Sequence, residues 1–255
     1  MYMSALPVVG NFDSSVATFA AGAATEATNI TGTGSINPPS LALRSAILVE
    51  PSTGQVLLSM NPDEPLPPAS MTKMMTEYLV AEQVKQGKLK WTDKVTVNEN
   101  ASKSIGSRIF LAQGDQHTVE ELYIAMAVGS ANDATVALAE RVSGTEQDFV
   151  KLMNETAQKM GMKNTYFINS TGLDRKDMPT GFQPDTDRET VMTARDAATL
   201  ASYIIKDHPD YTRFTTIQSY KFRPTDKAPI INYNWMLEAN KNITNFRKFA
   251  YPGLD

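Results

Sequence analysis

Helix-start signals recur between residues 118 and 208, and they constrain the fold more than any other feature of the sequence. Three threonines precede apolar runs at helical spacing and can cap helices: Thr118, Thr145 and Thr193. Gly129 interrupts the first run, and we expect Asp133 to cap a new helix directly after this break. This part of the chain therefore predicts short helices separated by breaks.

Strand-like runs and a further helix precede this region. Residues 45–61 hold two apolar runs around the turn sequence PSTG, which predicts a β-hairpin. Residues 70–87 then show helical periodicity and end at a glycine. The sequence therefore predicts a chain of mixed strands and helices.

The first forty residues differ from the rest. Residues 24–40 are rich in Thr, Gly, Ser and Pro and have no periodicity, as is typical of a linker. The small residues before them resemble the end of a secretion signal, but the first positive charge is Arg44, so an intact signal is not indicated. We interpret residues 1–40 as a flexible leader or linker, a remnant of an export signal, and residues 41–255 as one domain.

Composition excludes several classes of protein. The chain has 24 basic and 28 acidic residues, so it lacks the positive face that nucleic-acid binding needs. It has no cysteine and two histidines, which leaves almost no material for a metal site or a Ser-His-Asp triad. We therefore expect no metal, no cofactor and no nucleic-acid partner. No apolar stretch approaches the length of a membrane span.

Ser70 and Lys73 stand three residues apart at the start of the helix predicted for residues 70–87. Residues with this spacing share a helix face, so the lysine amine can reach the serine hydroxyl. The free N–H groups at a helix start favour the negative charge that develops when a serine attacks a carbonyl. The amine can act as the base only if burial or a nearby cation lowers its pKa.

Chance alone can produce this pair. With 17 Ser and 15 Lys in 255 residues, composition predicts about one Ser-x-x-Lys, and one is present. Serine is also a common helix cap, so an ordinary helix start remains an alternative. Placement favours catalysis, because Ser130 and Asn132 lie in the break between two predicted helices, where polar side chains can face a cleft.

Three long stretches carry a resemblance to a known family: LPPASMTKMMTEYLV, IGSRIFLAQGDQHTVEELYIAMAVGSANDATVALAERVSG and FVKLMNETAQKMGMKNTYFINSTGLD. They resemble the low-molecular-weight penicillin-binding proteins that act as D-alanyl-D-alanine carboxypeptidases. The resemblance implies an α/β (α+β) chain of the β-lactamase/transpeptidase-like fold, in which an antiparallel sheet packs with a helical subdomain. It implies that Ser70 is the acylated nucleophile and a substrate contact, Lys73 its base, Ser130 a proton relay, and Asn132 a ligand of the substrate amide.

The resemblance also implies the reaction and its setting. The enzyme would remove the terminal D-Ala from peptidoglycan stem pentapeptides through an acyl-enzyme, and β-lactam antibiotics would acylate the same serine. It would act outside the cytoplasm, at the outer face of the bacterial cytoplasmic membrane, with which full-length family members associate.

The chain departs from the family in one motif, because its 255 residues contain no Lys-Thr-Gly. We therefore expect the chain to lack C-terminal strands of the sheet and to be impaired or inactive by itself. One alternative is a class A β-lactamase-like hydrolase, although no convincing Glu-x-x-Leu-Asn is present. The other is a non-catalytic module that binds penicillin or the cell wall.

Overall fold

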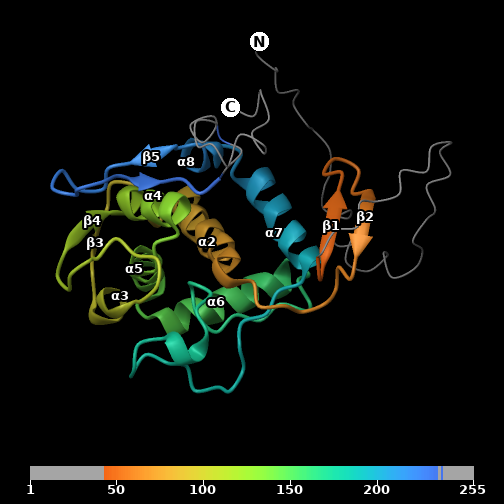
Figure 1. Ribbon diagram of the computed structural model, residues 1–255, viewed down its shortest axis with the longest axis horizontal. Helices are drawn as coiled ribbons and strands as arrows, with labels where there is room; N and C mark the ends of the chain where they lie inside the picture. Colours follow the sequence, from red (N-terminus) through yellow and green to blue (C-terminus); the bar gives the residue numbers. More distant parts are fainter. Residues whose placement is uncertain (1–42, 235–236, 238–255) are drawn as a thin grey trace, which may run out of the picture.

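The computed structural model describes residues 43–234 and residue 237, and its helices surround one central helix, α2 (Figure 1). The helices are α2 (Lys73–Lys85), α3 (Glu99–Lys103), α4 (Val119–Gly129), α5 (Asn132–Ser143), α6 (Glu146–Lys159), α7 (Ala194–Asp207) and α8 (Thr212–Thr215), with two 3-10 turns, η1 (Ala69–Thr72) and η2 (Arg175–Asp177). The expected leader or linker, residues 1–40, lies outside the described residues.

Within the described residues, six strands form three antiparallel pairs. They are β1 (Ala46–Val49) with β2 (Val56–Met60), β3 (Lys94–Thr96) with β4 (Gln116–Thr118), and β5 (Ser219–Tyr220) with β6 (Ile230–Ile231). The first pair is the hairpin predicted for residues 45–61. The mixed strand and helix composition predicted from the sequence is therefore confirmed.

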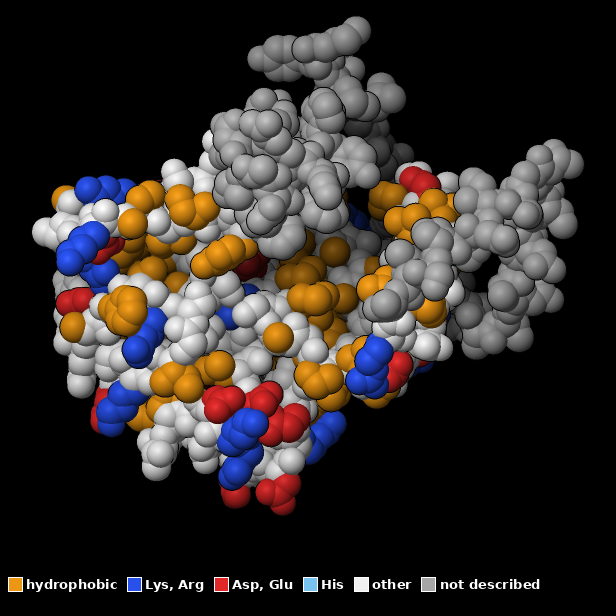
Figure 2. All heavy atoms as spheres, viewed as in Figure 1, with side chains coloured by type: hydrophobic (Ala, Val, Ile, Leu, Met, Phe, Trp, Pro, Cys, Tyr) orange, Lys and Arg blue, Asp and Glu red, His pale blue; other side chains and the backbone are white. Residues whose placement is uncertain are grey.

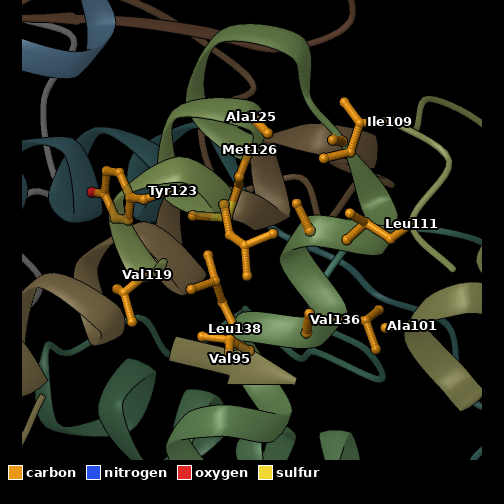
Figure 3. Close-up of a cluster of buried hydrophobic side chains, with 14 of the residues drawn as sticks. Val95, Ala101, Ile109, Leu111, Val119, Tyr123, Ala125, Met126, Val136 and Leu138 are labelled. Atoms are coloured by element: carbon orange, nitrogen blue, oxygen red, sulfur yellow. The ribbon is translucent and has the colours of Figure 1, made fainter. Parts of the chain in front are cut away.

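Helix α2 joins two hydrophobic clusters, because it packs against α4 and α5 on one side and against α6 and α7 on the other. Its residue Val80 belongs to the cluster that α4, α5 and β3 build, and Figure 3 shows Leu138 and Met126 pointing into that cluster. Met75 and Leu79 belong to the second cluster, together with buried residues of α6 and α7. Apolar burial on both sides fixes the position of the helix that carries Lys73.

The predicted helix starts are confirmed at the three threonines. The side chains of Thr118, Thr145 and Thr193 each accept a hydrogen bond from the backbone N–H three residues later. At Thr118, the carboxylate of Glu121 also accepts from the threonine's own N–H, which completes the capping box.

The prediction that Asp133 caps α5 is wrong. The helix begins at Asn132, and Ala131 occupies the cap position without a side-chain hydrogen bond. The carboxylate of Asp133 instead accepts hydrogen bonds from the backbone N–H groups of Ile109 and Leu111, at 3.0–3.1 Å. These buried N–H groups have no partner within their own loop, so the Asp133 carboxylate supplies the acceptor that they need. Because α5 begins one residue earlier, Asp133 lies inside the helix and not at its cap.

The surface combines apolar and charged regions. Acidic and basic side chains gather at the lower edge of Figure 2, where Figure 1 shows the loop that follows α6. Within the described residues, none of the helices is both long enough and apolar enough to cross a membrane.

Candidate active site

Ser70 and Lys73 are in direct contact at the start of α2. Ser70 lies in the 3-10 turn η1 and is exposed, whereas the side chain of Lys73, the first residue of α2, is buried. The amine Nζ of Lys73 donates to the hydroxyl Oγ of Ser70 over 3.1 Å. Ser70 makes no capping hydrogen bond, so the alternative that it serves as an ordinary helix cap is not supported.

The turn before α2 is strained. Pro67 and Pro68 restrict the backbone ahead of it, and Ala69 adopts a left-handed conformation with φ +47°. This conformation costs about 1–2 kcal/mol for a residue with a Cβ atom, and surrounding contacts must hold it. Such strain is common next to reactive side chains, and here it immediately precedes Ser70.

Lys73 has a second partner from a distant part of the chain. Its Nζ donates to the backbone carbonyl of Thr171 over 3.0 Å, in the loop that follows α6. Burial lowers the pKa of Lys73 to about 8, and the carboxylate of Glu77, one turn further along α2, opposes this shift. An amine with this pKa is neutral in an appreciable fraction of molecules near neutral pH, so it can accept a proton.

Glu77 is itself perturbed. Burial raises its pKa to about 7, and the neighbouring amine of Lys73 opposes the shift. The two groups therefore titrate close together, one turn apart on the same helix.

Ser130 and Asn132 occupy the predicted break between α4 and α5. Ser130 has a left-handed backbone, with φ 53° and ψ 34°, and its hydroxyl is buried with no hydrogen-bond partner within the described part of the chain. Such an unpartnered buried hydroxyl has a donor and acceptor free for a ligand or a proton transfer. This geometry suits the relay role that the family resemblance implies.

Asn132 is held by the loop before β4. Its side-chain Nδ2 donates to the carbonyl of Ile105, and its backbone N–H donates to the carbonyl of Ser107, each over 2.7 Å. The hydrogen bonds among the described residues do not join Asn132 to Lys73. Helix α2, which carries Lys73, packs against both α4 and α5, the two helices that the segment with Ser130 and Asn132 joins.

The sequence did not indicate that the loop of residues 169–172 belongs to the site, to which it contributes the carbonyl of Thr171. The side chain of Asn169 accepts from the N–H groups of Thr171 and Gly172, which folds the loop into a tight turn. Gly172 has φ +86°, and a Cβ atom there would lie 1.8 Å from the carbonyl oxygen of Ala69. The sequence NSTG contains this turn signal, but no local pattern predicts that the turn meets the strained residue before Ser70.

Comparisons with known proteins identify the family. Residues 33–248 match the model of the peptidase S11 family, described as D-alanyl-D-alanine carboxypeptidase. The chain is 41% identical over 213 residues to D-alanyl-D-alanine carboxypeptidase DacF of Bacillus subtilis, covering 83% of this chain and 49% of that protein. It is 36% identical over 196 residues to DacA of Haemophilus influenzae, covering 76% of this chain and 47% of that protein. The chain thus spans about half the length of the curated relatives it matches.

Solved structures show the same fold. A peptidoglycan synthesis regulatory factor (PBP3) from Streptococcus pneumoniae superposes with a TM-score of 0.72 at 33% identity, covering 78% of this chain and 56% of that one. Penicillin binding protein 5 from Haemophilus influenzae gives a TM-score of 0.66 at 35% identity, covering 76% and 54%. These structures confirm the β-lactamase/transpeptidase-like fold class, and the family match extends over most of the sequence. The chain therefore belongs to the S11 family of serine peptidases, the D-alanyl-D-alanine carboxypeptidases.

Proposed function

We propose that this chain supplies the nucleophile, the base and the proton relay of a serine D-alanyl-D-alanine carboxypeptidase. One observation carries the proposal: the buried amine of Lys73, with its lowered pKa, lies 3.1 Å from the hydroxyl of Ser70. A serine hydroxyl is a weak nucleophile until a neighbouring base takes its proton, and this geometry allows that transfer.

The proposed reaction uses these groups in turn. Lys73 removes the proton of Ser70 as the Oγ atom attacks the carbonyl of the penultimate D-Ala, which forms a tetrahedral oxyanion. The backbone N–H of Ser70 lies in the first turn, where N–H groups have no partner within the helix, and it stabilises that oxyanion. Ser130 passes a proton to the departing amine, and the peptide bond to the terminal D-Ala breaks. Water then hydrolyses the ester on Ser70, which frees the enzyme.

The substrate class and setting belong to the same proposal. The substrate is the stem pentapeptide of peptidoglycan, Asn132 binds its amide, and β-lactam antibiotics acylate Ser70. The protein acts outside the cytoplasm in the bacterial cell envelope, where full-length members of the family associate with the membrane. The names of the relatives and the penicillin-binding proteins of the same fold support this setting. The 255 residues contain no Lys-Thr-Gly, the motif that in the family would give a further oxyanion donor and a ligand of the substrate carboxylate.

Release of D-Ala tests the proposal directly. Incubated with a synthetic stem pentapeptide, the protein should release free D-Ala and leave a tetrapeptide, as measured by mass spectrometry, at a rate lowered by the absence of Lys-Thr-Gly from these 255 residues. The Ser70→Ala variant should release none above the uncatalysed rate, because the acyl-enzyme cannot form. Release that persists in Ser70→Ala would refute the proposal, and rapid hydrolysis of penicillin in place of the peptide would favour the β-lactamase alternative.

A further inference from the structure

Two loops hold the groups that the proposed reaction uses. The loop of residues 169–172 presents the carbonyl of Thr171 to the amine of Lys73. The loop that follows α3 presents the carbonyls of Ile105 and Ser107 to Asn132. The two loops are far apart in sequence, so a separate contact must fix their relative positions.

A buried carboxylate makes that contact. Glu146, the first residue of α6, is only 3% exposed. One oxygen, Oε1, accepts from the backbone N–H of Ser170 over 3.0 Å and from its hydroxyl over 2.6 Å. The other oxygen, Oε2, accepts from the side-chain Nδ2 of Asn100 over 2.9 Å. Ser170 directly precedes Thr171 in the first loop, and Asn100 belongs to α3, which directly precedes the second.

The hydrogen bonds from Ser170 and Asn100 to Glu146 are strong because they are charge-assisted. An ionised carboxylate binds N–H and O–H donors about twice as strongly as a neutral acceptor does. Its negative charge also lies in the first turn of α6, where the helix dipole favours it. Within the described part of the chain Glu146 forms no ion pair, and the neighbouring carboxylate of Glu140 repels its charge, so these donors and the helix end are what stabilise it.

Helix α2 is hydrogen-bonded to Ser170 as well. The hydroxyl of Thr76, three residues after Lys73, donates to the carbonyl of Ser170 over 2.9 Å. Ser170 therefore connects Glu146 to the helix that carries Lys73, while its neighbour Thr171 accepts from the Lys73 amine itself. A displacement of Ser170 would move both contacts.

We propose that Glu146 is a positioning residue, which fixes the loops that orient Lys73 and Asn132 without touching the substrate itself. The inference rests on the proposed function, because it assigns a structural cause to the geometry that the reaction needs. Without the carboxylate, the donors of Ser170 lose their acceptor and Asn100 keeps only its hydrogen bond to Glu140, so both loops are free to shift. A shift of about 1 Å at a reacting group can cost about 100-fold in rate.

The test compares variants by their rate of labelling with fluorescent penicillin. Protein that is lost irreversibly lowers the amplitude of labelling and leaves the observed rate constant unchanged, so the rate constant is the quantity compared. We expect Glu146→Ala to lower this rate constant about 10- to 100-fold. The control is Asp148→Asn, an exposed acid in the same helix turn that bonds only to Thr145 and Lys151, and it should label at the parent rate.

The Glu146→Gln variant keeps the size of the side chain and can keep its hydrogen bonds, whereas Glu146→Ala loses both. Glu146→Gln retains an oxygen that can accept from Ser170. Its amide N–H can donate to the Oδ1 atom of Asn100, which has no partner among the described residues, once the Asn100 amide turns over. We expect this variant to label within about threefold of the parent. A Glu146→Ala rate constant equal to the parent's, or a Glu146→Gln rate constant as low as that of Glu146→Ala, would overturn the proposal.

A milder change covers the case in which Glu146→Ala does not fold. Ser170→Ala removes only the 2.6 Å hydrogen bond to Glu146 and keeps the backbone N–H. We expect its labelling rate constant to fall about 3- to 10-fold. An unchanged rate constant in Ser170→Ala would count against the positioning role.

A second measurement does not require activity. Acetic anhydride modifies neutral, accessible amines, and mass spectrometry reports the extent at each lysine. We expect modification of buried Lys73 to rise several-fold in Glu146→Ala but not in Glu146→Gln, with the half-exposed Lys85 unchanged in both. Equal modification of Lys73 in all variants would overturn the positioning role. If the parent protein fails to react with penicillin, the proposed function fails, and the acetylation pattern still decides the role of Glu146.

Discussion

At Lys73, burial and neighbouring groups act on the amine in opposite directions. Burial disfavours the charged ammonium and lowers its pKa, whereas the Glu77 carboxylate favours the charged form. The carbonyl of Thr171 also accepts a hydrogen bond from the amine, which holds it in place beside Ser70. The balance leaves a pKa of about 8, close to the range in which a general base works best.

This balance predicts how the reaction depends on pH. The rate constant for penicillin labelling should rise with pH and level off above about 8, because only the neutral amine of Lys73 can take the proton of Ser70. Glu77→Gln removes a carboxylate that raises the pKa of Lys73, so the midpoint of the profile should move to lower pH.

The matched control is Glu82→Gln, which removes an acid further along the same helix, and its midpoint should stay in place. Labelling rates measured between pH 6 and 10 check this. A rate constant that does not change across this range would contradict the role of Lys73 as the base, and an upward shift in Glu77→Gln would contradict the assigned effect of the carboxylate.

At the scale of the elements, the position of Ser70 depends on the close contact between η1 and the loop of residues 169–172. Gly172 lies so close to Ala69 that no side chain fits between the two backbones. The close approach brings the carbonyl of Thr171 to the first residue of α2, where the amine of Lys73 meets it. The two segments thus depend on a glycine at one position.

Substitution of that glycine should be severe. Gly172→Ala combines a positive φ with a collision against the Ala69 carbonyl, so we expect a loss of about 4 kcal/mol or more in the free energy of unfolding. Gly181→Ala is the control, because Gly181 has a similar φ of +89° but no atom within 4 Å of an added Cβ, so it should cost only about 1–2 kcal/mol. Urea unfolding of both variants measures the difference. Equal losses in the two would show that the close approach does not matter.

Local signals predicted the elements better than the contacts between them. The threonine caps, the hairpin and the break at Ser130 follow from short-range hydrogen bonding and turn chemistry, which the sequence displays directly. Asp133 was misread as a cap because its partners, Ile109 and Leu111, lie more than twenty residues earlier. The sequence does not indicate the proposed role of Glu146 for the same reason, because its oxygens accept from Asn100 in α3 and from Ser170 in the loop after α6.

At the scale of the whole molecule, the site depends on segments that only the complete fold brings together. Ser70 and Lys73 come from the start of α2, Ser130 from the junction of α4 and α5, and Thr171 from the loop after α6. Hydrophobic clusters on both sides of α2 hold these segments in place. The proposed roles of Ser70, Lys73, Ser130 and Asn132 come from the resemblance, because composition alone could not distinguish the first pair from chance.

The most direct measurement is the identity of the residue that penicillin acylates. The protein is treated with penicillin, digested, and analysed by mass spectrometry for a peptide that carries one covalently bound penicillin. The account predicts that the bound mass lies on Ser70 and disappears in Ser70→Ala, because the amine of Lys73 activates this hydroxyl. A penicillin adduct on any other residue, or an adduct that persists in Ser70→Ala, would contradict it.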